Sequence, residues 1–138
     1  PFVEPTVELH GGRVRHPLSV GVKGGHLILV SVCGHWEMEN FNPLLGFMQE
    51  YCGSAHRNFA GALLRPHAVE FEELLKSGGG DDILSAAHEA GRQFVRSGTL
   101  PADKLATISR PLVTIEDYVA GVNQRMAERM AAARRLAA

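Results

Sequence analysis

Two short apolar segments constrain the fold of this chain more than any other feature. The first is His26–Val32, which follows a pair of glycines, and the second is Phe59–Leu64. Strands with one solvent-exposed face alternate apolar and polar residues, whereas strands covered on both faces are apolar throughout. We therefore predict two central, parallel strands that are buried on both faces.

The segment between these strands has the pattern of a helix. Asn42 is a favoured N-cap residue, and Pro43 suits the first helical position because its missing N–H costs nothing there. Gly53 is a favoured residue at a helix C-terminus. Six apolar residues recur between them at helical spacing: Leu44, Leu45, Phe47, Met48, Tyr51 and Cys52. The order strand, loop, helix, strand predicts a right-handed βαβ unit.

The N-terminal part has the pattern of a β-hairpin. Thr6–His10 and Arg13–His16 flank Gly11 and Gly12. A glycine pair between alternating runs favours a tight primed turn, since glycine adopts positive φ without strain. An irregular loop is the alternative. Polar residues outnumber apolar ones here, so we expect the hairpin at the surface.

The rest of the chain is predicted to be helical. A short helix over Val69–Lys76 ends at a run of glycines. Asp81 or Asp82 caps a longer helix that ends at Gly98, and Pro101–Ile108 forms one or two further turns. The core face of the longer helix is expected to contain Ile83, Leu84, Ala87, Ala90, Phe94 and Val95.

A C-terminal helix is expected to open at Thr114, with Asp117 in an approximate capping box. Its apolar stripe comprises Ile115, Tyr118, Val119, Val122, Met126 and Met130. This stripe is long for a helix that covers so small a sheet, and large apolar patches are rarely left bare. We therefore predict a two-fold homodimer, or a higher oligomer, that buries this helix or a sheet edge.

The chain has the length of a single α/β domain, 138 residues. We divide it into an extended hairpin segment over 1–22, a βαβα core over 23–98 and a helical extension over 99–138. A two-stranded parallel sheet leaves both of its edges unpaired. The sequence opens at Pro1 without an initiator Met, so we expect a C-terminal portion whose missing strands come from an N-terminal half or another subunit.

Composition excludes several classes of function. The 14 basic and 15 acidic residues give a net charge of −1, too little positive charge for a general nucleic-acid binder. The longest apolar stretch, Leu27–Val30, is too short to span a bilayer, and we expect a cytoplasmic protein. Cys33 and Cys52 are too few for an iron–sulfur cluster or a disulfide scaffold. They should lie at opposite ends of the βαβ layer as free thiols, beyond bridging distance.

Ligands of open α/β sheets bind beyond the carboxyl ends of the strands. The segments that leave those ends here are 31–40 and 65–67. Each residue also has a structural interpretation: Trp36 as a cap on the core, Cys33 as a small buried side chain, and Arg65 as a cross-link between loops instead of an anion ligand. Zinc bound by Cys33, His35 and His67 is a further alternative, although no recognised ligand spacing supports it.

The segment His26–His67 resembles the C-terminal half of flavodoxin-like NAD(P)H-dependent FMN reductases, the group that includes multimeric flavodoxins and iron–sulfur flavoproteins. The residues that carry the resemblance are Leu29–Phe41 and Phe59–His67, with support from 12–17 and 108–112. It implies part of a flavodoxin-like three-layer sandwich with an added N-terminal hairpin and a long C-terminal helix. It also implies FMN as cofactor and NAD(P)H as co-substrate.

By this resemblance, one loop lies beside the isoalloxazine ring of FMN. Its residues are Ser31, Val32, Cys33, Gly34, His35 and Trp36. Backbone groups would bond the ring edge, and His35 or Trp36 would flank the ring. FMN performs the hydride chemistry, so no catalytic acid or base is implied. The family's phosphate-binding loop follows its first strand and is absent from these 138 residues, so the chain alone should bind FMN weakly or not at all.

A hypothesis from a different class is a non-catalytic module for oligomerisation or protein interaction. Its binding surfaces would be the exposed sheet edge and the methionine-bearing C-terminal helix. A zinc hydrolase is a third possibility. Flavin titration and elemental analysis distinguish the three.

Overall fold

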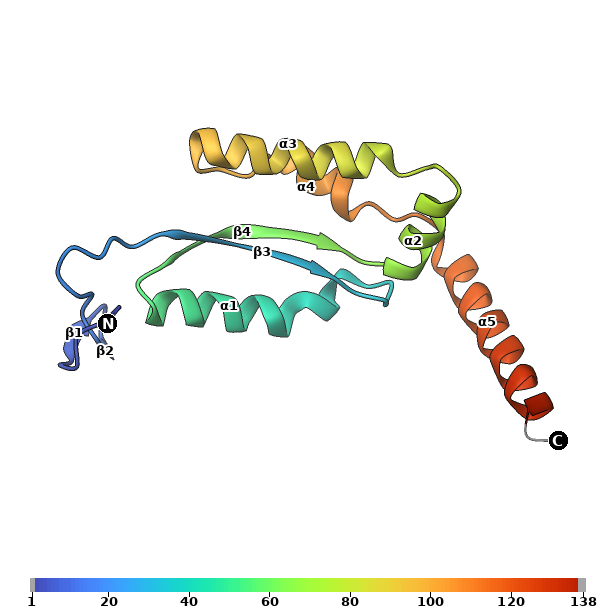
Figure 1. The fold of residues 1–138 in the computed structure, drawn as a ribbon, viewed down its shortest axis with the longest axis horizontal. Helices are drawn as coiled ribbons and strands as arrows, with labels where there is room; N and C mark the ends of the chain where they lie inside the picture. Colours follow the sequence, from blue (N-terminus) through green and yellow to red (C-terminus); the bar gives the residue numbers. More distant parts are fainter. Residues whose placement is uncertain (1, 137–138) are drawn as a thin grey trace.

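The computed structural model describes residues 2–136 of the chain (Figure 1). It contains two small sheets and five α-helices within that range. The elements, in chain order, are β1 (Glu8–His10), β2 (Arg13–Arg15), β3 (His26–Val32), the 3₁₀ turn η1 (Met38–Phe41), α1 (Asn42–Ser54), β4 (Asn58–Arg65), α2 (Ala68–Lys76), α3 (Asp81–Ser97), α4 (Ala102–Ser109) and α5 (Ile115–Leu136).

The centre of the fold is the parallel pair β3 and β4, joined through α1. Their register runs from His26 opposite Asn58 to Val32 opposite Arg65. It shifts between Leu27 and Ile28, where the partners step from Phe59 to Gly61. The predicted strands, their parallel pairing and the intervening helix are therefore confirmed, and the fold is mixed α/β.

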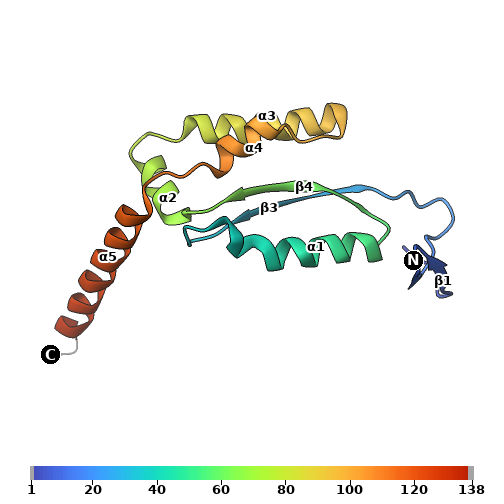
Figure 2. The ribbon, with the colours of Figure 1, turned by 180° about the vertical axis from the view of Figure 1, so that it is seen from behind.

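Helices lie on both faces of this sheet. α1 runs along one face, and α3 with α4 covers the other (Figures 1 and 2). The main core lies under α3 and α4, where Leu63, Ala86, Ala90 and Ile108 are buried together. Gly61 lets this layer approach closely, because a Cβ there would lie 3.0 Å from Leu100 Cδ1 and its φ of 128° is unfavourable for other residues. The glycine in β4 therefore leaves room for the side chain of Leu100, which lies in the connection between α3 and α4.

The prediction that both strands are buried on both faces is wrong for β3. Val30 is 72% exposed and Val32 is 65% exposed, whereas Leu63 and Leu64 in β4 are buried. The reason is topological: in the part of the chain that the structure describes, β3 pairs only with β4, so its other edge has no neighbour. The apolar residues Val30 and Val32 of β3 are therefore exposed in a strand with one unpaired edge.

The start and end of α1 also differ from the sequence prediction. Asn42 is not the N-cap: it has helical φ and ψ of −56° and −43°, and Phe41 occupies the cap position without a side-chain cap bond. The 3₁₀ turn η1 runs directly into the helix, so the chain is already wound before Asn42. At the other end the helix continues through Gly53 to Ser54, and Ala55 is the C-cap.

The apolar residues of α1 divide between two faces. Cys52 is buried, and Leu45 and Met48 are half-buried towards the rest of the fold. Phe47 is 62% exposed and Tyr51 is 49% exposed, and their rings stack on each other 6.2 Å apart. The six apolar residues at helical spacing therefore do not form one buried face, since Leu44, Phe47 and Tyr51 are exposed. Cys33 and Cys52 are both free, as predicted.

The N-terminal hairpin is confirmed. β1 and β2 pair antiparallel, with Leu9 opposite Val14, and Gly11 and Gly12 have φ values of 57° and 76° at the turn. Such positive values in both turn residues are typical of a type I′ hairpin. Arg13 forms an ion pair with Glu50 of α1. The hairpin lies at the surface, at the end of the sheet away from α5 (Figure 1).

The predicted helices after β4 are present, with small shifts. Gly80, with φ of 86°, is the N-cap of α3, so Asp81 and Asp82 lie in its first turn and do not cap it. An αL glycine followed by two acidic residues still suits the positive end of the helix dipole. α3 ends at Gly98 as predicted, but Leu84 and Val95 point away from its buried face and are 48% and 86% exposed.

The C-terminal helix starts as predicted. The Thr114 hydroxyl accepts a bond from the Asp117 N–H over 3.1 Å and donates to the Asp117 carboxylate over 2.9 Å. α5 then extends away from the sheet and the other helices (Figures 1 and 2). Of the helices within residues 2–136, none has both the length and the apolarity to cross a membrane.

Candidate functional site

The candidate site lies at the carboxyl ends of β3 and β4, where the sequence places it. Backbone bonds continue beyond the strands: Cys33 N–H donates to Arg65 O over 2.9 Å, and His67 N–H donates to His35 O over 3.1 Å. The first residue of α2 also bonds this loop, since Ala68 N–H donates to Cys33 O over 3.0 Å. The loop after β3 is thereby fixed to the start of α2.

His67 is almost fully buried, at 1% exposure. Its backbone is left-handed, with φ of 54°, which turns the chain from β4 into α2. Its Nε2 lies 3.0 Å from Trp36 O, and its Nδ1 lies 3.5 Å from Leu112 N. A carbonyl only accepts and an amide only donates, so the imidazole is the neutral tautomer with the proton on Nε2.

Trp36 packs directly against this imidazole. The two rings are stacked at 5.5 Å with an interplanar angle of 20°, and the indole Nε1 lies 3.4 Å from Val113 O. Both nitrogens of His67 are occupied, so it is not available to a metal. Within residues 2–136, no three His, Cys, Asp or Glu side chains are grouped to hold a metal ion. The zinc hypothesis therefore has no support from the geometry.

Arg65 is buried at 4% exposure and binds main-chain oxygens instead of a carboxylate. Its Nε donates to Pro66 O over 2.6 Å, and its two terminal nitrogens donate to Ile108 O over 2.6 Å and Arg110 O over 2.7 Å. Burial, followed by the positive charge of Arg110, lowers the pKa of Arg65 to about 10. The interpretation of Arg65 as a cross-link between loops is the one that this geometry fits.

Most polar backbone groups of the loop are already satisfied. Gly34 O accepts the Tyr118 hydroxyl over 2.8 Å, and His35 N–H lies 3.4 Å from Cys33 Sγ. Among the residues that the structure describes, the amide N–H groups of Gly34 and Trp36 have no hydrogen-bond partner. These two donors are unpaired within the described chain.

A hollow of about 290 Å³ adjoins the loop, between it, the start of α2 and α5. Arg125 of α5 contributes to its wall and bonds Glu70 of α2 over 2.7 Å. Burial, followed by the negative charge of Glu70, raises the pKa of Tyr118. The residues that line the hollow are Gly34, His35, Val69, Tyr118, Val122, Arg125, Met126 and Arg129.

The six predicted site residues have different surroundings. Ser31 and Val32 are the last residues of β3, and Val32 is exposed. Cys33 is half-buried, and its backbone bonds Arg65 and Ala68. Trp36 stacks on His67. Gly34 and His35 line the hollow. The structure thus brings Gly34 and His35 to an open space and places Trp36 against the interior.

Sequence reasoning did not find the contribution of α5 to this region. Tyr118, Arg125 and Arg129 line the hollow from a segment more than 80 residues further along the chain than Gly34. The available signal is their spacing of seven and then four, which places them on one side of a helix. That spacing does not say which loop the helix meets.

Comparisons of the chain with protein-family models, curated proteins and solved structures found no match.

Proposed function

We propose that this chain is the C-terminal portion of a flavodoxin-like, FMN-dependent NAD(P)H oxidoreductase. In this proposal the loop Ser31–Trp36 faces the isoalloxazine ring. The parallel β3–α1–β4 unit, with helices on both faces of the sheet, supports it (Figure 1). The loop also leaves the carboxyl end of a strand, the usual ligand position in such sheets.

The observation that carries the proposal is the pair of unused amide donors, Gly34 N–H and Trp36 N–H, on an otherwise satisfied loop. The pyrimidine edge of a flavin presents carbonyl oxygens that accept hydrogen bonds. A loop held by the backbone of β4 and α2 and by Tyr118 would keep both donors in place without further ordering. The exposed His35 would lie beside the ring.

FMN, when bound, would supply the hydride chemistry between NAD(P)H and an acceptor. The chain's own residues would bind and orient the ring: Gly34 and Trp36 through their amides, and His67 by holding Trp36 in place. No side chain of the site is assigned a catalytic acid or base role. The phosphate anchor would come from an N-terminal half or another subunit, so affinity of this chain alone should be weak.

A titration that compares riboflavin with FMN tests the proposal, because riboflavin has the ring without the phosphate. This chain should bind both weakly and with similar affinity. A chain extended by the residues encoded upstream of Pro1 should favour FMN and show a flavin band near ~450 nm. Saturable binding by neither chain would contradict the proposal.

Gly34 offers a matched pair of variants. Nothing lies within 4 Å of the Cβ position, so Gly34→Ala fits and keeps the amide donor. Gly34→Pro removes the donor, and the loss of one hydrogen bond of ~1 kcal/mol weakens flavin binding about fivefold. Circular dichroism verifies that the proline variant folds. Equal flavin affinity of two folded variants would exclude this amide as a ligand.

The alternative function is a non-catalytic interaction module. The unpaired, exposed edge of β3 and the extended α5 favour it. In that case flavins would not bind to the extended chain either.

A further inference from the structure

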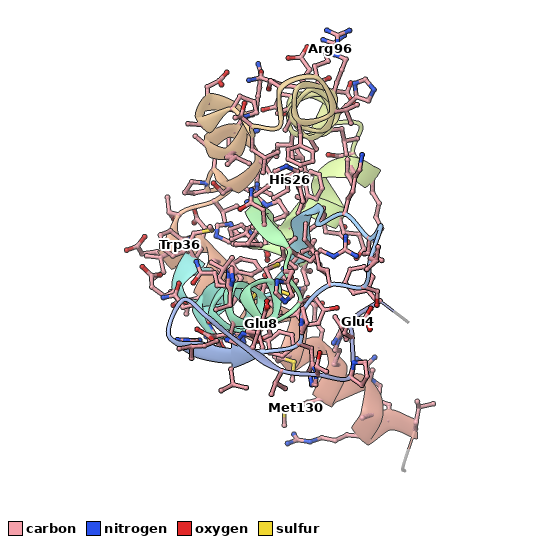
Figure 3. The ribbon with its side chains drawn as sticks, turned by 90° about the vertical axis from the view of Figure 1, so that its left-hand side faces the viewer. Glu4, Glu8, His26, Trp36, Arg96 and Met130 are labelled. Carbon is pink, nitrogen blue, oxygen red and sulfur yellow. The ribbon has the colours of Figure 1, made fainter. Side chains whose placement is uncertain are left out.

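Only the first half of α5 is attached to the rest of the molecule. Tyr118 bonds Gly34 O, and Arg125 bonds Glu70 of α2. Every residue from 126 to 136 is exposed. Figures 1 and 2 show this second half of the helix extending beyond the other elements, and Figure 3 shows Met130 at the opposite edge of the molecule from Arg96. These eleven residues are therefore little covered by the rest of the described chain, apart from Met126 and Arg129, which line the hollow beside the loop.

An unsupported helical segment of this length is marginal in water. Helix propensity contributes little per residue, and most helical stability in proteins comes from packing of an apolar face. The second half of α5 is therefore expected to need a neighbour.

The helix presents an apolar stripe that the body does not cover. Val119, Met126 and Met130 are 51%, 49% and 54% exposed, and Ile115 is 41% exposed. The spacings 115, 119, 122 and 126 alternate four, three and four, which is the pattern of a two-helix seam. At 100° per residue this stripe lies about a quarter turn away from Tyr118 and Arg125, the residues that hold the body.

We propose that the occupant of this stripe is α5 of a second copy of the chain, packed antiparallel about a two-fold axis. The two ends of the helix carry opposite charges. Its first turn contains Glu116 and Asp117, and its last turn contains Arg134 and Arg135. In an antiparallel pair the acidic end of one helix lies beside the basic end of the other, and the helix dipoles are also opposed.

A parallel pair would place like charges together at both ends and is disfavoured. The antiparallel pair also places the unsupported half of each helix against the attached half of the other. Ala133 lies in line with Ile115 at 100° per residue, and its small side chain allows a close approach of the two helices. This proposal is independent of flavin binding.

The first test changes the stripe in the full chain. Val119→Glu with Met126→Glu adds two charges to the stripe, and Ala127→Glu with Ala132→Glu adds two charges on other sides of the helix. Light scattering at micromolar concentration should give a dimer of twice 15.0 kDa for wild type and the control pair, and a monomer for the stripe pair. A monomeric wild type, or a dimer that survives the stripe change, would overturn the proposal.

Circular dichroism supplies a second readout. The stripe pair should lose part of the helical signal, because residues 126–136 fray without a partner, while the control pair keeps it. If the stripe pair aggregates, Met126→Gln can replace it. This single variant should have a dimer Kd several times larger than that of wild type. An unchanged Kd for Met126→Gln would count against the interface.

Orientation is tested by reversing charges. Arg134→Glu with Arg135→Glu should raise the dimer Kd about threefold or more, since each lost pair is exposed. Adding Glu116→Arg should recover part of that loss in an antiparallel dimer. In a parallel dimer each of these residues would face its own copy, so like charges would meet before and after either change. An unaffected Kd would therefore refute the antiparallel orientation.

Discussion

The imidazole of His67 stacks on the indole of Trp36, with 5.5 Å between the ring centroids, and the same imidazole lies 3.0 Å from the Trp36 carbonyl oxygen. One residue therefore fixes both the side chain and the backbone of the loop that follows β3. We attribute the shape of the candidate site to this pair.

Replacing His67 should destabilise the fold markedly. His67→Ala leaves Trp36 O and Leu112 N without partners and empties a buried space, at a cost of about 3 kcal/mol. His67→Asn should cost less, because asparagine tolerates positive φ and keeps hydrogen-bonding groups. Urea unfolding measures both variants. Equal stabilities for the two variants would show that neither the backbone conformation nor the hydrogen bonds matter.

Replacing Arg65 should destabilise the fold about as much as replacing His67. Arg65→Met fills a similar volume but leaves the carbonyls of Ile108 and Arg110 unsatisfied, which costs about 2–4 kcal/mol. Arg65→Lys can form one of these bonds at most, so its stability should lie between that of wild type and that of the methionine variant. The order wild type, lysine, methionine in denaturant midpoint is the expected result. A methionine variant as stable as wild type would mean that burial of the guanidinium costs as much as its bonds contribute.

Helix α1 provides a direct contrast between sequence and structure. From the sequence, Asn42→Ala removes a cap and costs about 1 kcal/mol, and Phe47→Ala removes a core side chain and costs about 2–5 kcal/mol. In the structure Asn42 is inside the helix and Phe47 is exposed, so each should cost less than about 1 kcal/mol. Leu45→Ala, on the half-buried face, should cost more than either. Thermal unfolding of the three variants decides which set of values holds.

The two thiols should react at different rates. Cys52 is 1% exposed, whereas Cys33 is half-buried at the end of β3. A thiol reagent should therefore modify Cys33 in the native protein and Cys52 only on unfolding, with two thiols in total. Rapid modification of both thiols in native protein would indicate that α1 opens easily.

The ion pair between Arg110 and Asp82 should make stability depend on acid pH. Arg110 donates to the Asp82 carboxylate from two nitrogens, over 2.9 and 3.1 Å, and these bonds lower the pKa of Asp82 below its ordinary 3.8. The unfolded chain then binds the proton first, so the pair's contribution is complete above pH ~4 and is lost as the pH falls through the folded value. Asp82→Asn should remove this part of the pH dependence, and an NMR titration of the carboxyl would verify the direction.

Local patterns predicted the elements, and long-range contacts decided the rest. The glycine pair at 11–12, the cap at Thr114 and the apolar runs of β3 and β4 each depend on neighbouring residues, and the structure contains all of them. The 3₁₀ turn before α1 was missed because its single turn-favouring residue, Asn40, does not distinguish a 3₁₀ turn from an irregular loop. The exposure of Val30 could not be predicted, since it depends on which strands lie beside β3.

The candidate site shows the same division. The sequence predicts that Gly34 and His35 lie beyond the end of a strand, and the structure places them there. The bonds from Arg65 to residues 108 and 110, and from Tyr118 to Gly34, connect segments more than 40 residues apart. Neither spacing nor composition specifies such pairs.

An NMR titration of the ¹⁵N-labelled chain with riboflavin tests directly whether the loop Ser31–Trp36 contacts a flavin. The largest amide shifts should occur at Gly34, His35 and Trp36, with little change in α1 or the hairpin. This experiment detects weak binding and needs no phosphate anchor. Shifts elsewhere, or none at saturating riboflavin, would contradict the assignment of this loop to the flavin.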